Sequence, residues 1–260
     1  MKTVLRHWCL MTFLAFGISG QGCSIVDGPC EKGKGDIVRR DVDIEAFTGI
    51  NMTMAGNVTI ERGEALSVEV EGQPNILDLI STDVEDGQWT IYPRSCVSNH
   101  KDFSVFITLP ELENVTLTGS GSITTLDSFD DDVDILLSGS GKITYAGQGE
   151  EANVALTGSG KITFSGDFAD ITVSHSGSGS VLLSGAADFL KATCSGSGGI
   201  DAYELVAANA QVVNSGSGSS KVYVTSELEA VVSGSGSIFY RGNAVVDETD
   251  NGSGSIINDN

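Results

Sequence analysis

The stretch TLTGSGSIT, residues 116–124, places a Gly-Ser-Gly tripeptide between aliphatic residues. The same tripeptide begins at positions 119, 139, 158, 177, 196, 216, 234 and 252, at intervals of 18 to 20 residues. A flexible linker has no physical reason to keep such a period. A solenoid does, because each repeat stacks on the one before it. The tripeptide therefore predicts a stack of similar coils rather than a disordered chain.

The residues around the tripeptide repeat in columns. The column two residues beyond the second glycine consists of Ile123, Ile143, Ile162, Val181, Ile200, Ser220, Ile238 and Ile256. The two-residue period of a strand places a second column on the same face. That column consists of Thr125, Tyr145, Phe164, Leu183, Ala202, Val222 and Tyr240. β-Branched residues favour strands, so both columns are expected inside the stack.

A third column lies two residues before the tripeptide, at Leu117, Leu137, Leu156, His175, Cys194, Asn214, Val232 and Asp250. Stacking like on like makes aliphatic ladders inside a parallel β-helix, and His175 is expected to pack there at a corner. Glycine suits the corners because it reaches positive φ and has no side chain to collide with the next coil. We therefore predict an all-β chain folded as a parallel β-helix.

The domain organisation follows from where the tripeptide occurs. We expect a signal peptide over residues 1–22, a tether over 23–35 and a single domain over 36–260. Within that domain, residues 119–260 hold the regular repeats. Residues 36–118 are expected to form irregular coils that cap one end, with strands at 41–44, 57–60, 66–70, 88–92 and 102–109 and a short helix at 75–80. Charged residues at 247–251 and 258–260 protect the other open strand edge.

The N-terminus has the features of an export signal. Lys2 and Arg6 form a basic region, and residues 8–18 form an apolar region too short to span a bilayer as a stable helix. Small residues before Cys23 resemble a bacterial lipoprotein cleavage site, although Gly20 stands where leucine is usual. We predict that Cys23 is lipidated and holds the protein on the outer membrane of a Gram-negative bacterium. An ordinary secretory signal remains the alternative.

The remaining cysteines leave their pairing open. Cys30, Cys96 and Cys194 follow the anchor position, and three is an odd number. Cys30 and Cys96 can form a disulfide in an oxidising compartment, but no spacing rule requires it. The sequence has no Cys-x-x-Cys pair and no metal-ligand spacing. We therefore predict neither a metal nor a cofactor.

The net charge of −21 restricts the partners. A surface this acidic repels phosphate backbones and anionic lipid heads, so the charge argues against nucleic-acid binding. Cations and basic partners remain compatible with it. The acidity also has a simple role, since it keeps an edge-rich β protein soluble.

Candidate chemical groups are few. His100 lies in a polar loop near Asp102, but the chain lacks a nucleophile elbow to complete a triad. A denser acidic run consists of Asp127, Asp130, Asp131, Asp132 and Asp134. Calcium requires converging oxygens around a turn glycine, which this run lacks, so a solvated acidic corner is the simpler interpretation. We predict no catalytic residues.

Two further patterns suggest surfaces for ligands. Tyr145, Phe164 and Tyr240 could form a sugar-stacking strip, but they share the face of the isoleucines and are expected in the core. The outward Thr124, Thr144 and Thr163 resemble an ice-binding ladder. That ladder ends after three members, because leucine and charged residues follow.

The run FTGIN, residues 47–51, connects the chain to a known family. Together with residues 41–93 and the later repeats, it resembles the bacterial putative auto-transporter adhesin, head GIN domain, over roughly residues 40–257. The resemblance implies an exported, often lipid-anchored protein with a right-handed β-helix. It brings no binding residues. Residues 54–57 (MAGN) depart from the Ser-Gly expected at the first turn.

These observations favour a non-enzymatic, exported envelope protein that presents a binding or scaffolding surface, adhesin-like, to a polymer or a protein. A rigid column suits many weak contacts. One alternative is a polysaccharide lyase or hydrolase, because other β-helices are enzymes; it requires clustered acids on an outer face. Another alternative is a structural protein that self-associates into homo-oligomers through an end or a face.

Overall fold

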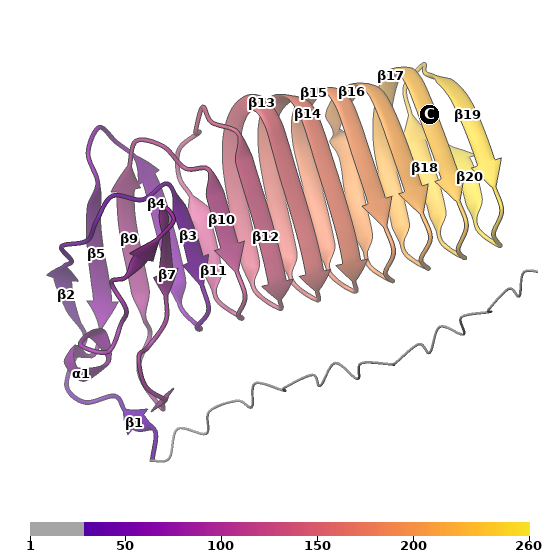
Figure 1. Cartoon of the computed structure of the whole chain (residues 1–260). Coiled ribbons are helices and arrows are strands. Elements are labelled where there is room, and N and C mark those ends of the chain that lie inside the picture. The colour runs from indigo at the N-terminus through magenta and orange to yellow at the C-terminus, as the bar shows by residue number, and fades with distance from the viewer. Residues whose placement is uncertain (1–28) are drawn as a thin grey trace, which may run out of the picture.

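The Gly-Ser-Gly corners stack directly on one another in the computed structural model, which describes residues 29–260. The central coils are formed by β12 (Val133–Gly139), β13 (Lys142–Gly158), β14 (Lys161–Gly177), β15 (Ser180–Cys194), β16 (Gly199–Asn214) and β17 (Ser219–Val232). β18 (Ser237–Arg241), β19 (Val245–Asp250) and β20 (Ser255–Asn258) complete the last coils. Figure 1 shows the coils side by side, with the corners along one edge and wider bends along the other.

The strands of successive coils pair in parallel and keep most of the predicted columns in register, with register shifts after Leu182 and after Ala202. Ile143 pairs with Ile162, which is 19 residues later, and Ile162 pairs with Val181. Like side chains therefore stack at these steps, and all three are fully buried. This register confirms the predicted all-β parallel solenoid.

The aromatic column lies inside the stack. The rings of Tyr145 and Phe164 are stacked, with centroids 5.7 Å apart and planes 14° apart. Tyr145, Phe164 and Tyr240 are all buried. Such a pair contributes about 1 kcal/mol beyond the area it buries. The interpretation as core residues is confirmed, and these rings are not available to stack on a sugar.

Residues 49–62 form a complete coil although they lack the tripeptide. β3 (Gly49–Met52) and β4 (Asn57–Arg62) pair in register with β10 (Asn114–Leu117) and β11 (Ser122–Thr125) of the first regular coil. Ile50 pairs with Val115, and Val58 pairs with Ile123. The segment between Met52 and Asn57 takes the place of a Gly-Ser-Gly corner.

The coils at this end do not stack in chain order. β7 (Gln88–Ile91) and β9 (Ser104–Leu109) lie on the outer side of β3 and β4, although the chain then returns to the inner side to form β10. The family motif at residues 49–51 is therefore enclosed between two coils that follow it in sequence. The prediction of irregular end coils did not include this insertion.

Antiparallel strands and a helix close the end. β5 (Ser67–Gly72) pairs antiparallel with β9 and with β2 (Val38–Asp41), and β6 (Val84–Glu85) pairs antiparallel with β7. β2 precedes the strand expected at 41–44. The helix α1 (Pro74–Leu77) is shorter than the expected 75–80, because Ile80 forms a β-bridge to Pro93. A reversed strand direction stops the parallel stacking, so this end resists further coils.

A disulfide joins Cys30 to Cys96 and settles the pairing that the sequence left open. It lies beside the short parallel pair β1 (Glu31–Lys32) and β8 (Val97–Ser98), so residues 30–34 are attached to the cap. Closing a loop of this length stabilises a fold by about 4 kcal/mol. Cys194 is free and buried. The expected signal peptide and Cys23 lie outside the described residues, and no helix among residues 29–260 has the length and apolar character to cross a membrane.

The corner glycines are required by the spacing of the coils. A Cβ on Gly179 would overlap the carbonyl oxygen of Gly160 in the preceding coil. We expect Gly179→Ala to lower the free energy of unfolding by about 1–3 kcal/mol, because the backbone must shift. Ser178→Ala is the matched control: its side chain is exposed, so it should have little effect in urea denaturation. Equal midpoints for the two variants would contradict this account of the corner.

The C-terminal end carries carboxylates in core columns. Glu248 pairs in register with Ala230, and Asp250 pairs with Val232. Another coil stacked on this end would bury both charges, which is costly. We expect Glu248→Val combined with Asp250→Val to produce dimers or longer stacks in light scattering. Glu227→Val with Glu229→Val is the control, because it removes the same charge from exposed positions. Its mass in light scattering should equal that of the wild type. If this control associates as much as the first variant, the change in net charge alone is responsible.

Candidate functional site

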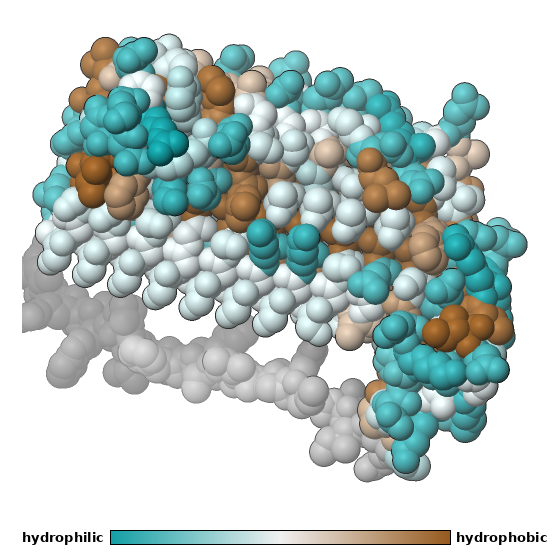
Figure 2. Space-filling view, turned by 180° about the vertical axis from the view of Figure 1, so that it is seen from behind, coloured by the Kyte–Doolittle hydropathy of each residue, from teal (hydrophilic) through white to brown (hydrophobic). Residues whose placement is uncertain are grey.

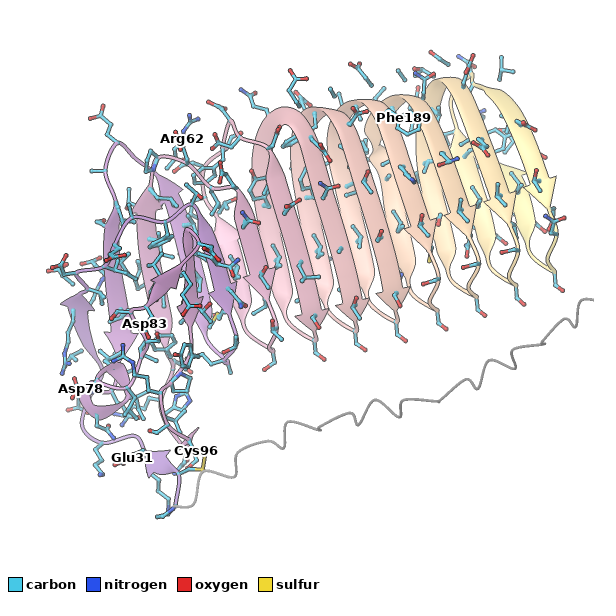
Figure 3. The ribbon with its side chains drawn as sticks, viewed as in Figure 1. Glu31, Arg62, Asp78, Asp83, Cys96 and Phe189 are labelled. Atoms are coloured by element: carbon cyan, nitrogen blue, oxygen red, sulfur yellow. A yellow bond between two sulfur atoms is a disulfide. The ribbon has the colours of Figure 1, made fainter. Side chains whose placement is uncertain are left out.

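The corners form an edge that differs electrically from the rest of the molecule. We call residues 118–122, 138–142, 157–161, 176–180, 195–199, 215–219, 233–237 and 251–255 the corner edge. It contains no Asp or Glu, although the chain has 35 of them. The serine of every tripeptide is exposed. Figure 3 shows side chains with oxygen tips pointing outward below the coils, and Figure 2 shows an evenly spaced pale row along the same edge.

A groove lies where the corner edge meets the cap. Its volume is about 570 Å³. The loop at 100–103 forms one wall, and the first three tripeptide corners with their flanking residues form the other. Most lining side chains are hydroxyls, amides or charged groups, and the aromatic one, Phe103, is buried. The groove therefore suits a polar ligand rather than a hydrocarbon chain.

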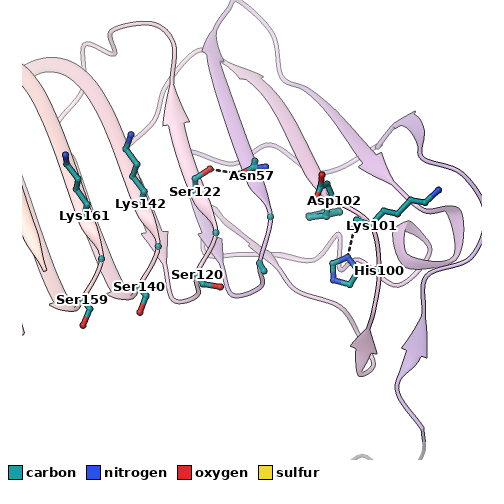
Figure 4. A pocket seen from close by; sticks show the side chains of 16 residues that line it. Asn57, His100, Lys101, Asp102, Ser120, Ser122, Ser140, Lys142, Ser159 and Lys161 are labelled. Carbon is teal, nitrogen blue, oxygen red and sulfur yellow. Dashed lines mark hydrogen bonds between the residues drawn. The ribbon is translucent and has the colours of Figure 1, made fainter. Parts of the chain in front are cut away.

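Two lysines supply the positive charge of the corner edge. Lys142 and Lys161 are exposed and directly opposite each other in the register of β13 and β14. Figure 4 shows their side chains running parallel from adjacent strands. Among residues 29–260, neither lysine forms an ion pair, whereas eight other cationic side chains do.

On the opposite wall, Lys101 and His100 already have partners within the chain. Lys101 points away from the two lysines and forms an ion pair with Asp36 at 3.2 Å. The backbone N–H of Lys101 donates to Gln73 Oε1 at 2.8 Å. Nδ1 of His100 donates to the Lys101 carbonyl at 2.7 Å. No hydrogen bond within the described chain joins His100 to Asp102 or to a serine, so the structure does not assemble a triad here.

Hydroxyl groups surround the lysine pair. Ser122 Oγ donates to Asn57 Oδ1 at 2.7 Å on the cap side. The next outward column holds Thr59, Thr124, Thr144 and Thr163 in register. The threonine ladder is thus longer by Thr59, which the sequence could not align because the tripeptide is missing from its coil.

The acidic run lies at the bends, on the edge opposite the corners. Asp132 Oδ1 accepts the backbone N–H groups of Glu150 and Glu151 at 2.9 and 2.8 Å. Asp130 forms an ion pair with Arg62, and Asp131 Oδ2 accepts the N–H of Leu112 at 3.3 Å.

These aspartates hold neighbouring loops in place. A groove of about 420 Å³ lies beside them, but among residues 29–260 no three His, Cys, Asp or Glu side chains are placed to hold a metal ion.

A short polar ladder interrupts the leucine column. His175, Cys194 and Asn214 follow Leu156 in register and are buried. Nδ1 of His175 lies 3.5 Å from Cys194 Sγ, and Asn214 Nδ2 donates to the Gly218 carbonyl at 2.8 Å. His175 lies at the corner as predicted. Its Nε2 has no partner within the described chain, and its exposure of 1% keeps substrates away.

Burial of His175 should make stability depend on pH. Burial lowers the pKa of His175 below its ordinary 6.5. As the pH falls through 6.5, the unfolded chain binds a proton that the folded chain does not, so stability is full above that pH and is lost below it.

His175→Leu restores the leucine column. We expect it to make the free energy of unfolding less dependent on pH below 6.5, by up to about 1.4 kcal/mol per pH unit. Urea midpoints at pH 7.5 and 5.5 measure it, with His100→Leu as control. An unchanged slope in His175→Leu would assign the dependence to other groups.

The comparisons agree with this architecture. The family model of the putative auto-transporter adhesin, head GIN domain, matches residues 46–244. The chain belongs to this family. No curated protein matches it. A structure from Parabacteroides distasonis named a putative lipid binding protein is similar, with 26% identity, a TM-score of 0.83 and coverage of 88% of this chain and 99% of that one.

Two structures named putative adhesins also resemble this head GIN protein. One, from Parabacteroides distasonis, has 21% identity and a TM-score of 0.82, covering 87% of this chain and 98% of its own. The other, from Bacteroides fragilis, has 24% identity and a TM-score of 0.66, covering 88% and 99%. These likenesses support the fold, and none of them assigns a ligand.

The lysine pair is the feature that sequence reasoning missed. A signal for it was present, because Gly-Ser-Gly-Lys occurs twice, at 139–142 and 158–161. The predicted columns begin one residue later, at Ile143 and Ile162, and therefore leave the two lysines out. Only the pairing of the coils shows that the two ammonium groups are neighbours and that the cap forms a wall beside them.

Proposed function

We propose that this head GIN protein is an exported, non-enzymatic protein of the cell envelope that binds a polymer along its corner edge. The observation that carries the proposal is the corner edge itself. It offers an exposed hydroxyl at each Gly-Ser-Gly corner, about 4.8 Å from the next, and no carboxylate. A linear polymer can form many weak contacts with such a row at once, which gives useful avidity.

The proposed location is the outer membrane of a Gram-negative bacterium, with a lipid on Cys23 as the anchor. Three observations support export. The N-terminal segment has the composition of a signal peptide, the family is described as adhesins, and the Cys30–Cys96 disulfide suits an oxidising compartment. The column then projects from the membrane surface and presents its edge to the surroundings.

Among residues 29–260, the enzyme alternative is best placed at the acidic groove at the bends. It is lined by Glu113, Asp131, Asp132, Asp134 and Glu151. Clustered carboxylates are what a hydrolase requires. However, Asp132 and Asp131 accept backbone N–H groups, and Asp134 accepts from Asn153 at 3.0 Å. Since these contacts hold loops together, we assign the cluster a structural role.

Blocking the corner edge tests the proposal. Ser159→Gln with Ser178→Gln lengthens two exposed side chains on the edge and should weaken binding to polysaccharides on a printed array by about tenfold, or about 1.4 kcal/mol. Ser174→Gln with Thr193→Gln makes the same change on an outer face, where the two residues also pair in register, and should bind as wild type.

The same incubations separate the alternatives. New reducing ends in the polysaccharide samples would favour a hydrolase over a binding protein. If the Ser159→Gln, Ser178→Gln variant binds as well as the Ser174→Gln, Thr193→Gln variant, the binding surface lies away from the corner edge. Absence of binding to every polysaccharide on the array would overturn the proposed function.

A further inference from the structure

The Lys142–Lys161 pair has a cost for the free protein. Like charges directly opposite each other on neighbouring strands destabilise a sheet. The same column holds Ser122 in the preceding coil and Ser180 in the following one, so the fold does not require a lysine there. A repulsive pair at positions that tolerate serine indicates that the two charges serve something outside the chain.

An anion is the group that would relieve this repulsion. Within residues 29–260, no carboxylate reaches either ammonium group to form an ion pair. The corner edge around the pair contains no acid. Asp102, on the cap wall, repels an anion from that end of the groove, so the favourable position is over the lysines.

The surroundings indicate what kind of molecule carries the anion. Ser140 and Ser159 lie one residue before the glycines that precede the lysines, and Thr144 and Thr163 lie two residues beyond the lysines. Hydroxyl donors and acceptors therefore flank the charges on both sides. Their spacing along the stack, about 4.8 Å, is close to the length of one sugar unit in an extended polysaccharide. Most side chains that line the groove are hydroxyls, amides or charged groups, which favours a polar ligand over an acyl chain.

We propose that the groove binds an acidic polysaccharide, with Lys142 and Lys161 holding its anionic groups and the corner hydroxyls contacting its sugar backbone. This inference rests on the proposed function and names its ligand class. The two lysines act as point charges, so carboxylate and phosphate groups on the sugar both suit them. The contact is partly screened, so affinity should fall as salt rises.

The test uses polygalacturonate and its fully methyl-esterified form, which has the same backbone without the charge. We expect the wild-type protein to bind the acid polymer and to bind the ester at least about tenfold more weakly. The double variant Lys142→Ser, Lys161→Ser should bind the acid polymer more weakly than the wild type by the same factor. Its weak binding to the ester should not change. Serine is the residue of the neighbouring coils, so the variant should fold.

Lys32→Ser with Lys191→Ser is the matched control. Both lysines are exposed and lack ion pairs within the described chain, and neither lies on the corner edge. This control removes the same charge and should bind the acid polymer as wild type. If it weakens binding equally, overall charge rather than the groove is responsible, and the inference is overturned.

Other outcomes are equally decisive. Equal binding of the acid and ester polymers would leave the proposed polymer binding intact and overturn the ligand class. Lysine-dependent binding to phosphatidylglycerol vesicles without binding to either polymer would replace the polysaccharide with a lipid surface. No binding to any probe would overturn both the inference and the proposed function.

The inference also has a readout without any ligand. Removing the repulsion should raise the melting temperature of the Lys142→Ser, Lys161→Ser variant at low salt, and 0.5 M NaCl should diminish the gain by screening. Adding polygalacturonate should stabilise the wild type more than this variant at the same polymer concentration. A variant less stable than wild type at low salt would show that the lysines support the fold instead.

Discussion

The close approach of one corner backbone to the next is the constraint on which the whole column depends. A Cβ on Gly160 would collide with the Gly141 carbonyl, and the same holds at corner after corner. Backbone N–H groups of Ser159 and Gly160 both donate to the Gly139 carbonyl, at 2.9 and 3.0 Å. The corners therefore fix the rise between coils and, through it, the register of both sheets.

A fixed register aligns the outward side chains of successive coils in columns, just as it aligns the inward ones. Inward columns become the isoleucine and leucine ladders, which supply the core. One outward column becomes a row of hydroxyls from Thr59 to Thr163, and a residue type that occurs at the same position of two successive repeats becomes a neighbouring pair. The Lys142–Lys161 pair arises in this way. The repeat that gives stability thus also gives a regular surface on which a polymer can lie.

Three departures from the repeat stand out because the columns are so regular. His175 and Cys194 place polar groups in the leucine column and remain sealed from solvent. Lys142 and Lys161 place like charges where neighbouring coils have serine. Glu248 and Asp250 place carboxylates in columns that hold Ala230 and Val232 one coil earlier. We infer a different consequence for each departure: stability for the first, binding for the second and assembly for the third.

The sequence by itself determined the solenoid, its corners and its core columns, because these depend on a period that local residues repeat. Burial of Ile143, Phe164 and His175 followed from that period alone. Only the tertiary structure decided the Cys30–Cys96 pairing and the insertion of residues 49–62 between later coils. It also decided the groove beside the lysines. These features join segments that share no period, so their contacts depend on the path of the chain through the cap rather than on any local pattern.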